Sequence, residues 1–447
     1  MPAKMRLAFD ISYAHMQGRW RLPGSWANRT YPDWDMFVEI AKIAEHGCID
    51  MIFSGDGTGI PATWRGSPDE AVRWGIVWPR QDLAPWFAAM SKVTDHVGFG
   101  LTYSSTFMHP YYVARLLNSL DHVTGGRIAF NVITSTRRAD AANYGFDELM
   151  EHGARYDRME EFMDVCLALW DSVEPDTMTW DRASGIVGKP EKVHPIDHVG
   201  TYFKVRGPLN TPPSPQGRPL LIQAGSSPRG IRASAHFADH IFAISTTMKR
   251  MVQHRHELDT ALREEGRDPS KVGMIFELIA VVEETEAEAK AHAALMLNAI
   301  PREGIGAFVS HEAGYDFSKL PARFTPGELN REIAATQASP VGMVHSLALE
   351  IGPDTEITRE EFFEYGLKHA TALDHTVAGT AEQVADILEE RFEATGSRGG
   401  FMLAHPVITP HDWLNVVKLL VPELQRRGRF RTRYEGRTLR ENMAVDP

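Results

Sequence analysis

The stretch VGFGLTYSSTFMHPYYVARLLNSLDHVTGGRIAFNVITS, residues 97 to 135, decides the fold. It begins with a short run of β-branched, aromatic and glycine residues (97–104) and continues with an amphipathic pattern of helical period (110–123). It ends with a second run of strand type (127–134). A strand, a helix and a second strand in this order predict a βαβ unit, in which the two strands run parallel.

The same alternation occurs along the rest of the chain. Eight runs predict strands, at 6–10, 50–55, 97–104, 127–134, 220–225, 240–245, 274–282 and 399–404. A helical pattern follows each of them, at 34–46, 83–95, 110–123, 155–172, 228–238, 248–265, 285–299 and 411–427. The competing architecture, an open doubly wound sheet, is disfavoured because its G-x-G-x-x-G fingerprint follows none of the expected strands. Since eight parallel βα repeats are what an α/β barrel requires, we predict a (β/α)8 TIM barrel.

Two stretches do not fit the repeat and are expected to be insertions. Residues 173–219 are rich in proline and glycine, so we expect loops with at most a small hairpin. Residues 300–378 carry helical patterns and no run of strand type. A barrel of about 250 residues with such insertions accounts for the length, so we predict a single domain over residues 1–447.

Composition and charge restrict the class of protein. With 43% apolar and 24% charged residues, the chain has the composition of a soluble globular protein. A net charge of −12 argues against nucleic-acid binding. The longest apolar run, 274–282, is too short to span a membrane, and Asp10 and Ser12 interrupt any signal peptide. Cys48 and Cys166 are too few for a disulfide framework, so we expect a cytoplasmic protein that acts on a small molecule.

Polar residues follow several expected strands, at the barrel end where active sites form. Ser226 and Ser227 precede Pro228 at the start of a helix, which suits either an anion site or a simple helix cap. His152, Arg155 and Tyr156 also begin a helix, and all three side chains can donate hydrogen bonds to a phosphate. The alternative is that Arg155 and its neighbour Asp157 only pair with each other.

Further candidates follow the second, third and fourth strands. The NVITS block (131–135) offers an amide and two hydroxyls that can form hydrogen bonds with the edge of a heterocycle. The alternative is that these side chains only cap the loop. Asp56 lies between glycines, and it either forms a turn or binds a ligand. Thr102 and Ser104 lie at the end of the third strand. No histidine in the loops is spaced for a metal site, so none is predicted, and the chain has no G-x-S-x-G elbow and no P-loop.

Several longer blocks carry a family resemblance that runs nearly end to end. They are WRLPGSW (20–26), DMIFSGDGTG (50–59), HPYYVARLLNSLDHVTGGRIAFNVITS (109–135), HGARYDRMEEF (152–162), HVGTYFKVRGPLNTPPSPQGRPLLIQAGSSPRG (198–230) and YEGRTLRE (434–441). These blocks resemble the nitrilotriacetate, dibenzothiophene sulfone and long-chain alkane monooxygenase family of bacterial luciferase-like flavin monooxygenases. The resemblance implies a barrel enzyme that takes reduced FMN from a separate NAD(P)H-dependent flavin reductase. It also implies dioxygen as co-substrate, oxygenation of a small organic molecule, and a homodimer or homotetramer.

Carried over residue by residue, the resemblance implies two groups of site residues. FMN contacts fall on Asp56, Thr102, His152, Tyr156, Ser226 and Ser227, with Asn131, Thr134, Ala224 and Gly225 as neighbours. His15 and His311 fall in segments that line the family's substrate pocket and are the candidate catalytic residues. The chain departs from the alkane oxygenase pattern at Thr136, where that enzyme has a histidine, and this argues against an alkane substrate.

Two other functions remain as alternatives, and the substrate is open. They are a deazaflavin-dependent dehydrogenase of the same superfamily and a non-catalytic flavin-binding protein. Trp64, Trp74 and Trp78 favour an aromatic, heterocyclic or sulfur-containing substrate. Nearby arginines (65, 73 and 80) would suit a polycarboxylate instead.

The C-terminal segment 426–440 carries seven arginines on an otherwise acidic chain. Such a basic segment is either a solvated end or a docked one, held on the acidic surface of its own or a neighbouring subunit.

Overall fold

The computed structural model describes residues 2–12, 19–26, 34–225, 227–244, 247–299, 301–336, 342–370, 376–404 and 410–445. Eight parallel strands close into a barrel, in the order β1-β2-β3-β4-β9-β10-β11-β15 and back to β1. Their bounds are β1 Arg6–Asp10, β2 Met51–Ser54, β3 Gly98–Ser104, β4 Ile128–Ile133, β9 Leu220–Ala224, β10 His240–Ala243, β11 Gly273–Val282 and β15 Gly399–Ala404. All eight expected strands are therefore present, and the predicted (β/α)8 barrel is confirmed.

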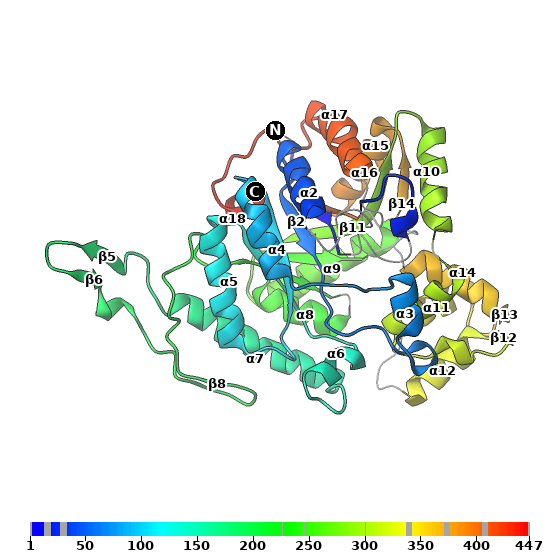
Figure 1. Cartoon of the computed structure of the whole chain (residues 1–447), viewed down its shortest axis with the longest axis horizontal. Helices are drawn as coiled ribbons and strands as arrows, with labels where there is room; N and C mark the ends of the chain where they lie inside the picture. The colour runs from blue at the N-terminus through cyan, green and yellow to red at the C-terminus, as the bar shows by residue number, and fades with distance from the viewer. Residues whose placement is uncertain are drawn as a thin grey trace.

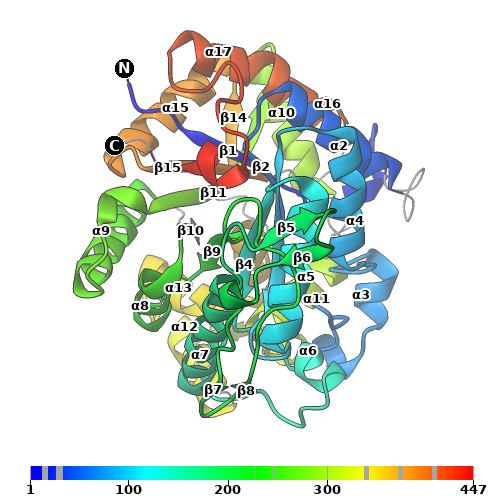
Figure 2. The same cartoon turned by 90° about the vertical axis from the view of Figure 1, so that its left-hand side faces the viewer.

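Helices surround the barrel (Figures 1 and 2). They are α2 Asp35–His46, α4 Leu83–Met90, α5 Pro110–Thr124, α7 His152–Asp171, α8 Pro228–Phe237, α9 Met248–Glu264, α10 Glu286–Asn298, α15 Ala381–Ala394, α16 Pro410–Asn415 and α17 Val421–Arg426, with a π-turn at Val416–Leu420 between the last two. Local signals set their ends. In α5, the His109 ring accepts a hydrogen bond from the N–H of Tyr111, Pro110 takes the first position, and Gly125 ends the helix with φ of 71°.

A short C-terminal helix, α18 (Leu439–Met443), fills the barrel interior at the end where the strands begin. Leu439 and Met443 are fully buried among inward-facing strand residues such as Met51 and Ile222. A Cβ atom on Gly98 of β3 would lie 2.4 Å from a methyl group of Leu439. The glycine in β3 therefore makes room for α18, and the open end of the barrel is the end where the strands finish.

The two stretches outside the βα repeat carry small elements of their own, and the first holds one hairpin more than the single one expected at most. The first holds two small hairpins, β5 Met178–Asp181 with β6 Ile186–Gly188 and β7 His198–Val199 with β8 Lys204–Val205, and Figure 1 shows this arm projecting from the barrel. The second is mainly helical: α11 Arg302–Ala313, α12 Pro326–Thr336, α13 Gly342–Ile351 and α14 Arg359–Ala370. It lies beside α3 (Asp69–Trp74), as Figure 1 shows, and a hydrophobic cluster of its own joins it to Trp64, Ile76 and Val77.

The structure also differs from the sequence prediction at three strands and one helix of the second insertion and the segment that follows it. Residues 300–378 were expected to contain no strand, yet Arg323–Phe324 (β12) pairs with Ile357–Thr358 (β13), and Thr376–Gly379 (β14) pairs with the end of β11. The helix α15 was not foreseen either, although Thr380 and Gln383 form a capping box at its start. These strands are two to four residues long, which is too short for a period of two to be recognised.

The C-terminal arginines are docked on their own chain. Arg427 pairs with Asp386 and Glu389 at 2.6 Å, and Arg440 pairs with Asp239 at 3.0 Å. Arg431 reaches the fully buried Asp50 at 2.5 Å. The docked alternative is thus the correct one, and these ion pairs hold the segment that leads to α18 against the barrel.

Searched over its described residues, the chain offers no helix with the length and apolar character that a bilayer crossing demands.

Candidate active site

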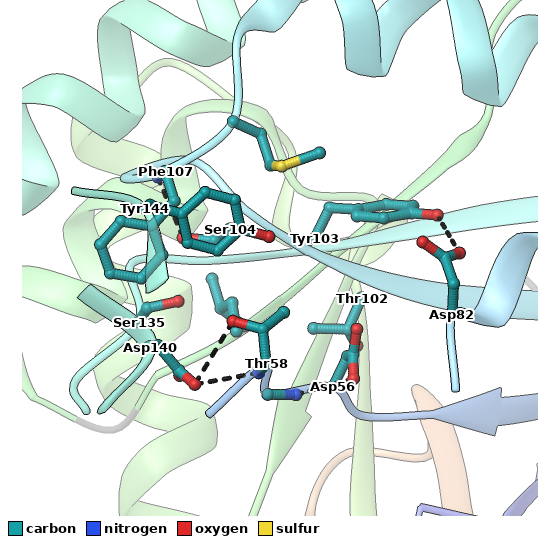
Figure 3. A pocket seen from close by; sticks show the side chains of 13 residues that line it. Asp56, Thr58, Asp82, Thr102, Tyr103, Ser104, Phe107, Ser135, Asp140 and Tyr144 are labelled. Carbon is teal, nitrogen blue, oxygen red and sulfur yellow. Dashed lines mark hydrogen bonds between the residues drawn. The ribbon is translucent and has the colours of Figure 1, made fainter. Parts of the chain in front are cut away.

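Two adjoining cavities lie at the end of the barrel where the strands finish. The larger encloses about 640 Å³ including its mouth, and its walls come from the ends of β2, β4 and β9, the loop after β4, and α7. The smaller, about 430 Å³, carries the rings of Tyr103, Phe107 and Tyr144 and is called here the aromatic cavity (Figure 3). Asp56, Ile133, Ser135 and Asp140 line both cavities, so the two form one continuous region. Its position matches that of active sites in α/β barrels.

A chain of hydrogen bonds crosses the barrel just beneath this region. The side-chain amide of Asn131 donates to the hydroxyl of Thr102 at 2.9 Å, and that hydroxyl donates to the carbonyl of Ser54 at 2.9 Å. The amide oxygens of Asn131 and Gln223 are buried, and neither has a hydrogen-bond partner among the described residues. Because a buried acceptor without a donor is costly, this pair is suited to a ligand that brings N–H or O–H groups.

Asp56 supplies the charge at the centre of the region. Its carboxylate lies 3.5 Å from the guanidinium of Arg80 and accepts the N–H of Gly57 at 2.8 Å. Burial raises the pKa of Asp56 and outweighs the opposing effect of Arg80. Arg80 also donates to the carbonyls of Gly55 and Ser12, at 3.0 Å each. The arginine therefore fixes the loops after β1 and β2 and orients the carboxylate between the two cavities.

Tyr156 of α7 lines the larger cavity, and the start of α8 packs against it. Ser227 caps α8 by accepting the N–H of Gly230 at 3.1 Å, and Pro228 follows at the first position. A Cβ on Gly230 would lie 2.8 Å from the hydroxyl of Tyr156, so α8 begins directly against that hydroxyl. The ring of His152 lies 5.1 Å from the ring of Tyr156. A helix N-terminus, a serine and a tyrosine hydroxyl together suit an anionic group.

The arginines of these helices face elsewhere. Arg155 donates to the carbonyl of Met150 at 2.7 Å, and Asp157 pairs with Arg229 at 2.7 Å. The expected local pair of Arg155 with Asp157 is therefore replaced by two other contacts, and neither arginine lines either cavity.

Comparisons with known proteins agree with this geometry. Residues 9–399 match the sequence profile described as luciferase-like monooxygenase. The chain belongs to the luciferase-like monooxygenase family. It is therefore a monooxygenase, and it uses a flavin.

Three relatives illustrate how far the similarity of this monooxygenase extends. Dibenzothiophene-sulfone monooxygenase of Rhodococcus erythropolis is 33% identical over 442 residues, 98% of this chain and 95% of that protein. Nitrilotriacetate monooxygenase component A of Aminobacter aminovorans is 34% identical over 444 residues, with the same coverage of both chains. The crystal structure of a long-chain alkane monooxygenase superimposes with a TM-score of 0.87 at 32% identity, covering 99% of this chain and 96% of the other. These relatives do not favour the deazaflavin dehydrogenase alternative.

The structure brings most of the predicted cofactor residues of the monooxygenase together. Asp56, Thr134, Tyr156 and Ala224 line the larger cavity, and Asp56 and Thr102 line the aromatic one. Asn131 joins Thr102 beneath them, Gly225 continues from Ala224, His152 contacts the ring of Tyr156, and Ser227 caps α8 beside it; neither His152 nor Ser227 lines a cavity. Ser226 lies outside the described residues.

The structure describes only one of the two candidate catalytic histidines. His15 lies outside the described residues. His311 is buried in α11 and lines neither cavity, and its Nε2 has no hydrogen-bond partner among the described residues. Burial, with Arg137 nearby, lowers the pKa of His311 to about 4, so the ring is neutral near pH 7.

The tryptophans expected at the pocket mouth lie elsewhere. Trp64 is buried in the hydrophobic cluster of the second insertion, 5.7 Å from the ring of Phe363. Trp74 packs against the same cluster, and neither it nor Trp78 lines either cavity. The prediction of an apolar pocket rested on the wrong residues, because the rings that line the aromatic cavity are Tyr103, Phe107 and Tyr144.

Sequence reasoning also missed the loop after β4. Asp140 is buried and accepts the N–H groups of Thr58 and Gly59, at 2.9 and 2.6 Å, which ties the loop after β2 to α6 (Arg138–Asn143), as Figure 3 shows for Thr58. Ser135 has a φ of 48°, a conformation that serine rarely adopts. Ser135 ends the NVITS block, which the sequence analysis had singled out, whereas Asp140 lies beyond it and carried no signal of its own.

Proposed function

We propose that the enzyme is the oxygenating component of a two-component system that uses reduced FMN and dioxygen to oxygenate a small organic molecule. The observation that carries this proposal is the buried, unpartnered amide oxygen of Gln223, which lines the larger cavity, together with that of Asn131 on the neighbouring strand β4. A flat heterocycle with N–H groups along its edge satisfies such acceptors. An apolar ligand would leave them unpaired.

In this proposal the chain holds the two ends of FMN differently. Asn131, Thr134 and Asp56 surround the ring system, and Ala224 and Gly225 allow the chain to pass close to it. Ser226, Ser227, Tyr156 and the N-terminus of α8 bind the phosphate. His152 supports the Tyr156 ring from the preceding turn of α7.

Reduced flavin supplies the chemistry by activating dioxygen for the transfer of one oxygen atom. The chain's own task is to orient the substrate and to exclude water. The aromatic cavity adjoins the proposed ring site through Asp56 and Ser135, so a substrate there would face the ring edge. In the aromatic cavity Tyr103 donates to Asp82 at 3.1 Å, which fixes that ring as a wall (Figure 3).

The aromatic cavity favours an aromatic, heterocyclic or sulfur-containing substrate. Three aromatic rings gather in it, with those of Phe107 and Tyr144 stacked at 5.1 Å. Arg137 lines the larger cavity but pairs with Glu312 at 2.8 Å, and Arg80 is held by Asp56 and two carbonyls, so these two arginines of the described site are already engaged and do not favour a polycarboxylate. A relative named for dibenzothiophene sulfone supports the same class.

A turnover screen tests the proposal. The enzyme is mixed with a flavin reductase, NADH, FMN and ¹⁸O₂, and loss of each candidate substrate is followed by mass spectrometry. We expect an aromatic or sulfur compound to gain one ¹⁸O atom only when all components are present. Consumption of polycarboxylate amines alone would refute the substrate class. Inactivity across the panel would favour a non-catalytic flavin protein, and inactivity combined with tight deazaflavin binding would favour the dehydrogenase.

We propose, further, a cytoplasmic homo-oligomer supplied by a separate NAD(P)H-dependent flavin reductase. The projecting arm presents Trp180, Ile186 and Val187 to solvent, with exposed fractions of 69%, 54% and 48%. Apolar side chains gathered on an extended hairpin are typical of a protein interface. Sedimentation of the enzyme and of a Trp180→Ser, Ile186→Ser variant tests this. A dimer or tetramer that dissociates in the variant supports it, and a monomeric native enzyme contradicts it.

A further inference from the structure

Three side chains of metal-binding type converge just after the end of β11, and none of them lines either cavity. Glu283 directly follows β11, His292 lies in α10, and His411 lies in α16. One ligand atom from each falls within 4.8 Å of the others. Oε1 of Glu283 is 2.9 Å from Nδ1 of His292 and 3.0 Å from Nε2 of His411. The three residues are far apart in sequence, so no local motif predicts the cluster.

We propose that Glu283, His292 and His411 bind one divalent transition-metal ion of the zinc type. Zinc bonds of about 2.0 to 2.2 Å to nitrogen and oxygen place tetrahedral ligand atoms about 3.3 Å apart. The spacing of the two histidine nitrogens from Oε1 is slightly shorter, so small side-chain rotations admit the ion. Two imidazoles and one carboxylate match zinc better than calcium or magnesium, which prefer oxygen ligands alone.

Neighbouring side chains orient two of the three ligands. The second ring nitrogen of His292, Nε2, lies 3.3 Å from the carboxylate of Asp412, and the Asp412 side chain is only 2% exposed. A carboxylate on the far nitrogen of a histidine is the usual support of a metal ligand, because it fixes the tautomer and the ring orientation. The amide of Asn415 donates to Oε2 of Glu283 at 2.8 Å and to the carbonyl of Val282 at 2.9 Å. Oε1 of Glu283 therefore faces the two histidines.

The proposed metal site is open to solvent on one side, and an ion bound there would link three segments of the chain. The His411 side chain is 58% exposed, which leaves solvent access for a fourth ligand such as water. The three ligands belong to β11, α10 and α16, so the ion would fasten α16 to the barrel. The inference does not depend on flavin binding, because none of the three residues lines either cavity.

Metal titration of the full-length chain tests the proposal. After treatment with a chelator, zinc binding is measured by competition with a chromogenic indicator, and cobalt is added separately to record its visible spectrum. We expect one zinc per chain, a cobalt spectrum of tetrahedral type, and a melting temperature that rises by about 2 to 3 °C at a hundredfold excess of zinc over Kd.

Variants separate this site from adventitious binding. We expect His411→Ala and Glu283→Gln each to weaken zinc binding at least tenfold, and Asp412→Asn to weaken it about 10- to 100-fold. His194→Ala is the matched control, because His194 is exposed and, among the described residues, pairs with a single carboxylate, that of Glu174, at 2.6 Å. Zinc affinity that is unchanged in His411→Ala, whose exposed side chain makes folding defects improbable, would overturn the proposal. A native chain that binds no zinc would overturn it as well, leaving a hydrogen-bonded network only.

Discussion

Asn131 is the residue whose surroundings say most about what the site binds. Its amide nitrogen is held by Thr102, and its amide oxygen is buried without a partner among the described residues. The hydrogen bond to Thr102 fixes which way the amide faces, since the Thr102 hydroxyl already donates to Ser54. A fixed acceptor of this kind discriminates between ligands with and without a matching donor.

Replacing Asn131 with alanine should weaken the binding of reduced FMN by about 1 to 3 kcal/mol, the usual effect of removing one partner of a buried hydrogen bond. Anaerobic fluorescence titration measures it. Asn298→Ala, at the exposed end of α10, is the control and should leave the affinity unchanged. Equal affinities for both variants would mean that Asn131 only supports Thr102.

At the scale of elements, the start of α8 carries the proposed phosphate site. The Ser226→Ala, Ser227→Ala double variant should weaken reduced FMN binding by about 1 to 3 kcal/mol, with partial compensation by the helix N–H groups. Thr247→Ala is the matched control, because Thr247 caps the neighbouring helix α9 by accepting the N–H of Arg250. Both changes should cost about 1 kcal/mol of stability through loss of a cap, yet only the first should change FMN affinity. If the double variant binds FMN normally, the serines act as a cap alone.

The helix α18 is a second element whose role can be measured, because it closes the barrel at the end where the strands begin. Leu439→Ala removes a fully buried side chain beside Gly98 and should lower the free energy of unfolding by about 2 to 5 kcal/mol. Urea denaturation measures the change. Leu295→Ala, at a leucine that is 58% exposed, should change stability by less than about 0.5 kcal/mol. A small effect at Leu439 would show that the barrel holds its shape without α18.

For the whole molecule, two buried carboxyls make stability depend on pH. Burial, together with the nearby Asp10 carboxyl, raises the pKa of Glu277 to about 8. Burial raises the pKa of Asp10 to about 6 against hydrogen bonds from Ser12 and the charge of Arg80. The folded chain therefore holds protons that the unfolded chain has released, so stability is greatest below the unfolded values and falls as pH rises toward about 8.

Glu277→Gln removes the carboxyl group with the larger of the two pKa shifts. The variant should be more stable than the native enzyme by about 1 to 3 kcal/mol at pH 8.5, because no charge then has to be buried. The difference should shrink toward pH 5, and denaturation at both pH values measures it. Glu264→Gln, at an exposed position in α9, should show no such dependence. A native enzyme whose stability rises between pH 5 and 8 would contradict the argument.

The sequence by itself determined the barrel and singled out several residues of the region where the two cavities lie. Strand and helix periods are local, so 97–135 and its repeats could be recognised without knowing their neighbours in space. The strand-end rule then singled out Asp56, Thr102 and Asn131, because parallel strands finish at one end of a barrel, and the family resemblance added Ala224.

Only the tertiary structure decided which loops meet. It buried Trp64 in the second insertion, put Tyr103, Phe107 and Tyr144 into one cavity, and paired Asp50 with Arg431. It also brought Glu283, His292 and His411 within 4.8 Å of one another. Such contacts join residues far apart along the chain, and their geometry is set by how the elements pack. A period of two or of 3.6 residues records which face of an element is buried, but not the partner that buries it.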